Sequence, residues 1–168
     1  EWKLRAVEML WSCVDLDKYP AKELDAMWKK LLINQFHDII PGSSINMVYQ
    51  TTHKEYEEIH KGCDDLIAQS ANTLFQEDKN AFVLMNSLSY KWKGMVTLPE
   101  SLNGYEILNE NGERVKVQKI GEKIEAFVSL NPLSFSTFRK GEKSNTEELT
   151  DNGLILENDL IRYEFNDQ

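Results

Sequence analysis

The sequence has few basic residues, few cysteines and no long apolar run. Its 28 acidic residues outnumber the 19 basic ones, which gives a formal net charge of −9, and no basic run offsets this charge locally. Such a chain repels phosphate backbones and anionic lipid, so we expect no nucleic-acid partner. The apolar runs cover only a few residues, far fewer than the ~20 that a membrane-spanning helix needs. We therefore expect no membrane segment.

Cysteine occurs only twice, at Cys13 and Cys63, and Cys63 falls on an apolar helical stripe where a thiol acts as a small hydrophobe. We predict that both thiols are reduced and structural. The sequence contains no Asn-x-Ser/Thr motif, and its first residues carry no secretory signal. These absences favour an intracellular protein, and we predict a cytoplasmic location. The missing initiator Met and the strand-like pattern at the end of the sequence predict a fragment of a larger protein.

The first part of the sequence shows the apolar spacing of amphipathic helices. Leu4, Val7, Trp11 and Val14 mark a first helix, and Pro20 fits the first turn of a second one. A third helix, capped by Ser43 or Ser44, continues for about 30 residues, or ~45 Å at the helical rise. Short connections between three such helices favour an antiparallel bundle, which we place at residues 1–78.

The periodicity changes near Asn80. Short strand-like runs follow at residues 82–85, 95–98, 105–108, 115–117 and 124–128, and residues 109–112 (Asn-Glu-Asn-Gly) form a hairpin signal. We therefore predict an antiparallel β domain at residues 79–140. Residues 141–168 read as a polar linker followed by one more hairpin. The predicted fold class is α+β, with the helical bundle first and the mainly antiparallel β segment second.

A His-Asp pair, His37-Asp38, falls at the end of the second predicted helix. The apolar stripe Leu24, Met27, Trp28, Leu31, Leu32, Phe36 and Ile39 continues past this pair, and Pro41 then stops the helix. On a helical wheel His37 lies almost opposite the stripe, so we predict that it is exposed. Ile33 and Ile40 lie on the same side as His37, which makes this end apolar on two faces. Something outside the bundle is expected to cover it.

A histidine beside a carboxylate has three open roles. It binds a metal, transfers a proton in catalysis, or makes a hydrogen bond inside a core. His53, Glu57 and His60 imitate the spacing of metal ligands on one helix flank, but the charged residues around them favour a solvated face. Trp2, Trp11 and Trp28 are predicted as bundle core rather than sugar platforms, and packing on the sheet is also the favoured role of Tyr90 and Trp92.

Residues 31–45, with Trp28 before them and Val48-Tyr49 after them, resemble the middle-domain motif of glycoside hydrolase family 38, the class II α-mannosidases. Residues 86–90 with 94–99 resemble the first β segment after the helical domain of these enzymes, and residues 132–138 resemble its closing strand. Residues 156–165 resemble the opening hairpin of the family's large C-terminal β-sandwich. The family's N-terminal catalytic barrel and most of the sandwich have no counterpart in this sequence.

The resemblance implies a retaining, zinc-dependent enzyme that hydrolyses terminal α-mannosides of oligosaccharides. In this family two histidines and two aspartates hold one zinc ion, and the match assigns His37 as a zinc ligand and Asp38 as a substrate-binding residue. Retaining glycosidases use two carboxylates about 5 Å apart. The family's pair lies in the barrel, so no catalytic residue is assigned here, and the isolated chain is expected to lack zinc. The rival hypothesis is a non-catalytic helical and β interaction module or carbohydrate-binding module.

Overall fold

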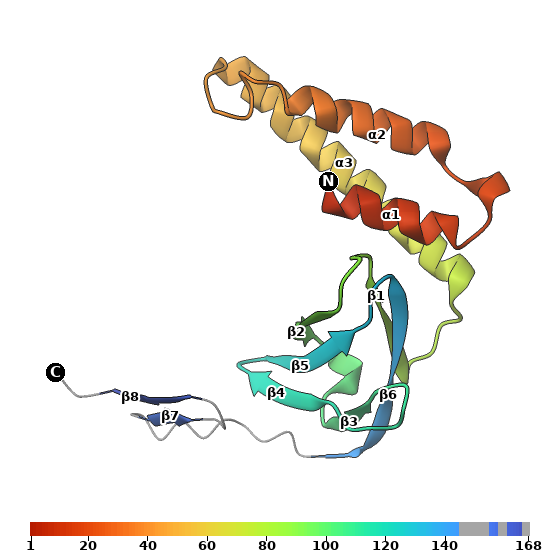
Figure 1. The fold of residues 1–168 in the computed structure, drawn as a ribbon, viewed down its shortest axis with the longest axis vertical. Coiled ribbons are helices and arrows are strands. Elements are labelled where there is room, and N and C mark those ends of the chain that lie inside the picture. The colour runs from red at the N-terminus through yellow and green to blue at the C-terminus, as the bar shows by residue number, and fades with distance from the viewer. Residues whose placement is uncertain (145–154, 158–160, 166–168) are drawn as a thin grey trace. The chain divides into compact units, whose positions relative to one another are not determined.

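A computed structural model describes residues 1–144, 155–157 and 161–165. The chain divides into two compact units, Glu1–Glu77 and Asp78–Gln168. The first unit contains the helices α1 (Trp2–Ser12), α2 (Ala21–Asn34) and α3 (Asn46–Leu74), with a short 3₁₀ helix, η1 (Leu16–Lys18), between α1 and α2. Strands follow in the second unit (Figure 1), so the predicted α+β class is confirmed.

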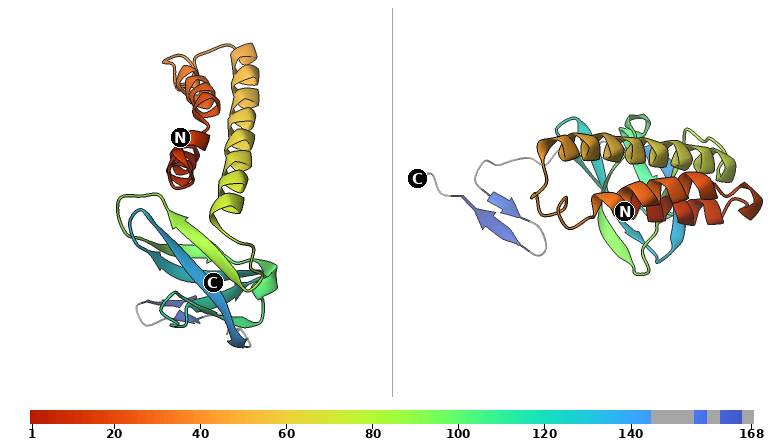
Figure 2. Two further views of the ribbon diagram at one scale, coloured as in Figure 1. Left: turned by 90° about the vertical axis from the view of Figure 1, so that its right-hand side faces the viewer. Right: turned by 90° about the horizontal axis from the view of Figure 1, so that it is seen from above.

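Both α1 and α2 pack against the long helix α3 (Figure 2). The buried side chains recur every three or four residues on all three helices, as one apolar face per helix requires. They are Leu4, Val7, Trp11, Leu24, Met27, Leu31, Ile59, Cys63 and Leu66. Among the described residues, none of the helices combines the length and apolar character that a membrane crossing needs.

Two tryptophans bind the helices together through their indole nitrogens. Trp11 Nε1 donates to the Leu66 carbonyl of α3 at 3.1 Å, and Trp28 Nε1 donates to the Glu8 carboxylate of α1 at 2.9 Å. The predicted packing role is thereby confirmed for both. For Trp2 it is wrong, since this residue is 65% exposed and its ring lies 5.0 Å from the Arg5 guanidinium. Trp2 begins α1, before the first buried position of the stripe.

Both cysteines are free, as predicted. Cys63 is buried in the helical core, and this burial raises the pKa of its thiol. The Cys63 thiol is therefore neutral and inert at physiological pH. Cys13 is exposed just after α1 and does not belong to the core.

The second unit contains two three-stranded antiparallel sheets. One has the strand order β1-β6-β3, and the other has the order β2-β5-β4. The strands are β1 (Ala81–Asn86), β2 (Trp92–Thr97), β3 (Tyr105–Leu108), β4 (Lys116–Ile120), β5 (Lys123–Leu130) and β6 (Ser134–Lys143), with a 3₁₀ helix, η2 (Glu100–Leu102), between β2 and β3. Within the described range 82–138 the only helix is this short one, so the predicted change from helix to strand is confirmed.

Side chains from both sheets form one core. β5 shows the alternation most clearly, because Ile124, Ala126, Val128 and Leu130 are buried while Phe127 and Ser129 between them are exposed. The Phe82 and Phe138 rings stack with their centroids 5.1 Å apart. Trp92 packs against this core, as predicted, whereas Tyr90 is exposed and has no packing role in the sheet.

The turn predicted at residues 109–112 is present, with Gly112 at φ +79° and a backbone bond from Gly112 N to Asn109 O. The strands on either side nevertheless separate after a single bridge, between Leu108 and Arg114. β3 then pairs with β6, and β4 pairs with β5. The Asn-Gly signal thus marks a change of sheet rather than the tip of a hairpin within one sheet.

Asn86, at the end of β1, is 4% exposed. It connects the turn between β1 and β2 with the turn between β5 and β6. Its Nδ2 donates to the carbonyls of Tyr90, at 2.9 Å, and Asn131, at 2.8 Å, while its Oδ1 accepts from the Leu88 amide. Leu133, in the same β5–β6 turn, has φ +45° and donates its amide to the Leu88 carbonyl. Side-chain bonds to the backbone therefore hold both turns in place.

In the last part of the chain, β7 (Ile155–Glu157) pairs antiparallel with β8 (Arg162–Glu164), as the predicted final hairpin requires. β6 continues to Lys143, three residues into the segment predicted as a linker. The rest of the predicted linker, residues 145–154, lies outside the described residues. The relation of this hairpin to a β-sandwich stays a prediction.

Gly94, in β2, gives a first testable prediction. A Cβ at this position would lie 2.5 Å from a ring carbon of Trp92, and this indole packs against the β core. We expect Gly94→Ala to lower the free energy of unfolding by about 1–3 kcal/mol, because the ring must move away from its packed position. Urea unfolding measures the change.

Gly62→Ala in α3 is the matched control. There the new methyl would meet only the flexible thioether of Met27, and alanine favours the helix by about 1 kcal/mol over glycine. A Gly94→Ala protein as stable as the wild type would show that the Trp92 position is adjustable.

Candidate functional site

The α2–α3 loop, residues 35–45, carries the His37-Asp38 pair. The sequence predicts this pair on the last helical turn before Pro41, and that prediction is wrong because α2 ends at Asn34. Beyond Asn34 the backbone bonds become tighter: Gln35 N donates to Leu32 O, and Phe36 N donates to Ile33 O. Such bonds to the third preceding residue replace the α-helical pattern. The pair therefore lies in a turn rather than on a helix.

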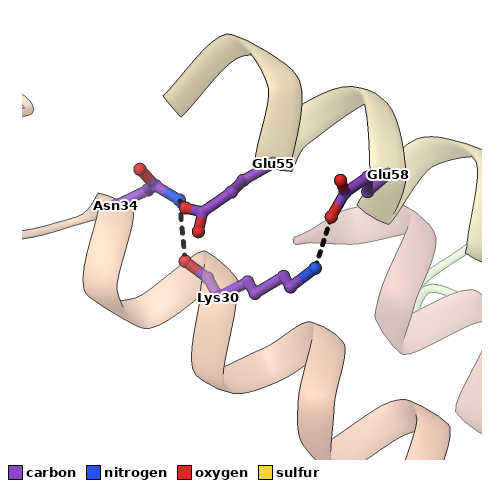
Figure 3. A network of polar contacts seen from close by, with 4 residues as sticks. All are labelled: Lys30, Asn34, Glu55 and Glu58. Atoms are coloured by element: carbon purple, nitrogen blue, oxygen red, sulfur yellow. Dashed lines mark hydrogen bonds and ion pairs between the residues drawn. The ribbon is translucent and has the colours of Figure 1, made fainter. Parts of the chain in front are cut away.

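The end of α2 is fixed by Asn34, which is only 3% exposed. Its Nδ2 donates to the Lys30 carbonyl at 2.9 Å and to the Glu55 carboxylate of α3 at 2.7 Å (Figure 3). Asparagine is a weak helix former because its amide competes for backbone partners. Here that amide bonds both the carbonyl of the preceding turn and the Glu55 carboxylate, so Asn34 anchors the last residue of α2 to α3.

A neighbouring ion pair also connects α2 with α3. Lys30 Nζ donates to the Glu58 carboxylate (Figure 3). This hydrogen bond lowers the pKa of Glu58 and raises the pKa of Lys30. Both groups thus remain charged through the neutral pH range.

Within the loop, tight turns bring the chain back toward α3. Ile39 N and Ile40 N both donate to the Phe36 carbonyl, at 2.9 and 3.1 Å, and Gly42 N donates to Ile39 O at 3.2 Å. Gly42 has φ +83°, a conformation that residues with a Cβ rarely adopt. α3 begins one or two residues later than expected, with Ile45 as its N-cap, and no side chain caps it. The predicted Ser43 or Ser44 cap is therefore wrong.

His37 is exposed, as predicted. Its ring lies beside that of Phe36, with the centroids 4.5 Å apart and the planes inclined at 46°. Within the described part of the chain, nothing forms a hydrogen bond with this imidazole. Its nitrogens are therefore available to a ligand from outside these residues.

Asp38 is half-buried, and one of its carboxylate oxygens, Oδ1, is shielded from solvent without a hydrogen-bond partner in the part of the chain described. A buried carboxylate oxygen without a donor costs about 1–3 kcal/mol or more. Such an atom fits a hydroxyl donor or a cation that comes from elsewhere.

These two residues fit part of a zinc shell. A neutral imidazole and a carboxylate are both common zinc ligands, and zinc in proteins usually has four ligands. Across residues 1–144, 155–157 and 161–165, no three His, Cys, Asp or Glu side chains gather closely enough to hold a metal ion. The alternative flank, His53, Glu57 and His60, lies exposed along α3 and forms no such group either.

Large exposed apolar side chains precede and follow the pair along the chain, and we call them the apolar rim. The rim residues are 57–67% exposed: Leu32, Ile33, Phe36, Ile40, Ile45 and Met47. The predicted stripe placed Leu32 and Phe36 in the bundle core, which is wrong because both are more than half exposed, and Phe36 lies beyond the end of α2. The predicted apolar character of the His37 side is confirmed by Ile33 and Ile40.

Tyr49 is the site residue that sequence reasoning missed. The apolar spacing predicts it on the third helix and the family motif includes it, but neither gives it a role in the site. In the structure its hydroxyl contacts the backbone of the α2–α3 loop at Asp38, Ile39 and Ser44. This role depends on the path of the loop, for which spacing gives no signal.

The sequence is similar to those of known proteins. The family described as Alpha mannosidase middle domain matches residues 1–74. An α-mannosidase from Saccharomyces cerevisiae is 34% identical over 107 residues, which cover 62% of this chain and 10% of that protein. Alpha-mannosidase 2C1 of Mus musculus is 27% identical over 146 residues, 86% of this chain and 13% of that protein. The human protein of the same name is 33% identical over 84 residues, 49% of this chain and 8% of that protein.

The chain thus spans roughly a tenth of the length of the curated relatives that it matches. The resemblance to family 38 that the sequence analysis drew from residues 31–45 is confirmed. The roles of His37 and Asp38 stay predictions.

Proposed function

We propose that this chain, which matches the Alpha mannosidase middle domain family over residues 1–74, is part of a zinc-dependent enzyme of glycoside hydrolase family 38. The whole enzyme hydrolyses terminal α-mannosides of oligosaccharides with retention of configuration. The observation that carries this proposal is the pairing of a free imidazole, on His37, with a shielded carboxylate oxygen, on Asp38, in one loop of a mannosidase middle domain.

In this proposal His37 binds the zinc ion through a nitrogen of its neutral imidazole. Zinc, when bound, supplies a Lewis acid and a template for sugar hydroxyls. Asp38 accepts a hydrogen bond from a sugar hydroxyl through its carboxylate, which is half-buried and has an oxygen without a donor among the described residues. The nucleophile and the acid/base carboxylate belong to another domain, and no residue of this chain is assigned to them.

The remaining parts of the site come from the same polypeptide in this proposal. The relatives are about ten times longer than the region they share with this chain, so their other domains have the room to supply ligands. In this proposal the apolar rim meets the N-terminal catalytic barrel, because so many large apolar side chains left exposed within one short stretch of chain are typical of an interface. A C-terminal β-sandwich and the cytoplasmic location belong to the same proposal.

The test uses the intact polypeptide and the isolated 168-residue chain. We expect the purified intact protein to contain about one zinc ion and to release 4-nitrophenol from 4-nitrophenyl α-mannoside. The isolated chain with added zinc should show no turnover above a heat-denatured control, because the catalytic carboxylates lie outside it.

The rival function, a non-catalytic interaction or carbohydrate-binding module, predicts a different result. The rival would be supported if the intact protein contained no zinc and hydrolysed no α-mannoside, yet was retained on a mannoside affinity column. Turnover by the isolated chain would contradict the assignment of both catalytic carboxylates to another domain.

A further inference from the structure

His37 and Asp38 lie beyond the end of α2 at Asn34, so contacts other than helical hydrogen bonds must hold them in place. Residues inside a helix are positioned by its regular hydrogen bonds, but this pair lies beyond them. The loop has its own bonds, and these run among Phe36, Ile39, Ile40 and Gly42. They shape the turns without attaching the pair to α3.

The attachment comes from Tyr49, in the first turns of α3. The Ser44 amide donates to the Tyr49 hydroxyl at 3.0 Å, and this hydroxyl lies 3.4 Å from the carbonyl oxygens of both Asp38 and Ile39. A phenol hydroxyl has one proton and two lone pairs, so it accepts from Ser44 while it donates to one of the two carbonyls. One atom thus joins the middle of the loop to its C-terminal end.

α3 gives Tyr49 a rigid frame. The Tyr49 amide bonds to the Ile45 carbonyl, and the ring is half-buried. Further along, α3 packs into the helical core through Ile59, Cys63 and Leu66. A second, weaker contact supports the same carbonyl, because Ser43 Oγ lies 3.4 Å from Asp38 O.

We propose that Tyr49 is a positioning residue, which fixes the Asp38 backbone and thereby the directions of the His37 imidazole and the Asp38 carboxylate. This inference rests on the proposed function, since it concerns the same metal and sugar site. Groups that orient metal ligands typically change metal affinity or activity by 10–100-fold when they are removed. Tyr49 acts at the low end of this range, because it holds the backbone and does not touch the ligand atoms.

The experiment compares Tyr49→Phe with Tyr56→Phe in the intact protein. Tyr56 lies two turns further along α3 and packs against the helical core, and its hydroxyl has no hydrogen bond within the described ranges. Both variants lose one phenol hydroxyl from the same helix, so a general effect on stability is common to both. Zinc affinity is measured by chelator competition, and kcat and KM for 4-nitrophenyl α-mannoside are measured at saturating zinc.

We expect Tyr49→Phe to weaken zinc binding about tenfold and to raise KM at saturating zinc, while Tyr56→Phe leaves both unchanged. Wild-type zinc affinity and KM in Tyr49→Phe would overturn the inference and leave the proposed function intact. An intact wild-type protein with neither zinc nor mannosidase activity would refute the proposed function and this inference with it.

If Tyr49→Phe fails to fold, Ser43→Ala decides instead, since it removes the other hydroxyl at the Asp38 carbonyl. A smaller loss of zinc affinity in the same direction supports the inference. An unchanged affinity in Ser43→Ala would then overturn it.

Discussion

His37→Ala in the intact protein is expected to cost more zinc affinity and turnover than any other single change in this chain. The substitution removes one of about four ligands of the proposed zinc ion, and loss of a ligand should exceed the roughly 10–100-fold effect of outer residues. Because the imidazole is exposed and makes no hydrogen bond within the described residues, the isolated chain should keep its stability within about 0.5 kcal/mol. Zinc analysis of the intact variant and thermal melts of the isolated chain measure the two effects.

His53→Ala is the matched control, because this histidine is also exposed and lies on the neighbouring helix α3. It should leave zinc content, turnover and stability unchanged. A structural role for His37 predicts the reverse of our expectation, with a destabilised isolated chain and undiminished zinc in the intact protein. That pair of results would remove the main functional assignment.

Asn86→Ala should strongly destabilise the β unit. The substitution removes hydrogen bonds to Tyr90, Asn131 and Leu88 from a site that is almost fully buried. At about 0.5–1.5 kcal/mol for each bond, and with buried backbone groups left unpartnered, the free energy of unfolding should fall by about 2–4 kcal/mol. Urea unfolding of the isolated chain provides the measurement.

Asn80→Ala provides the comparison for Asn86→Ala. Asn80 is exposed just before β1, and its side chain makes no hydrogen bond within the described part of the chain. It should change stability by no more than about 0.5 kcal/mol. Equal stabilities of the two variants would show that water replaces the Asn86 bonds at little cost.

The helix and strand content could be predicted because apolar spacing reports directly on which face an element buries. The stripes of α1 and α3 and the alternation of β5 are of this kind. The end of α2 could not be predicted in the same way. Its apolar spacing continues past Asn34, but the backbone there changes to bonds with the third preceding residue, and Asn34 is anchored to Glu55, a residue 21 positions away.

Long-range contacts also determine the strand pairing and the Tyr49 bonds, which the sequence did not predict. The Asn-Gly turn at residues 111–112 was visible, but the choice of partners for β3 and β4 depends on β6 and β5, which come later in the chain. For the site, the identities of His37 and Asp38 came from a motif, and the exposure of His37 agreed with its position relative to the stripe. The bonds to Tyr49 required the folded loop.

The hydrogen bonds of Asn34 and Tyr49 at the α2–α3 loop affect the entropy cost of ligand binding. Fixing the backbone of one residue costs about 1–2 kcal/mol, and a loop that becomes ordered only on binding loses that free energy from its affinity. Here Asn34 anchors the residue before the loop and the Tyr49 hydroxyl contacts its middle, so part of this ordering cost is met when the helical unit folds. In the proposed site, a ligand of His37 and Asp38 would therefore lose less binding free energy to the ordering of this segment.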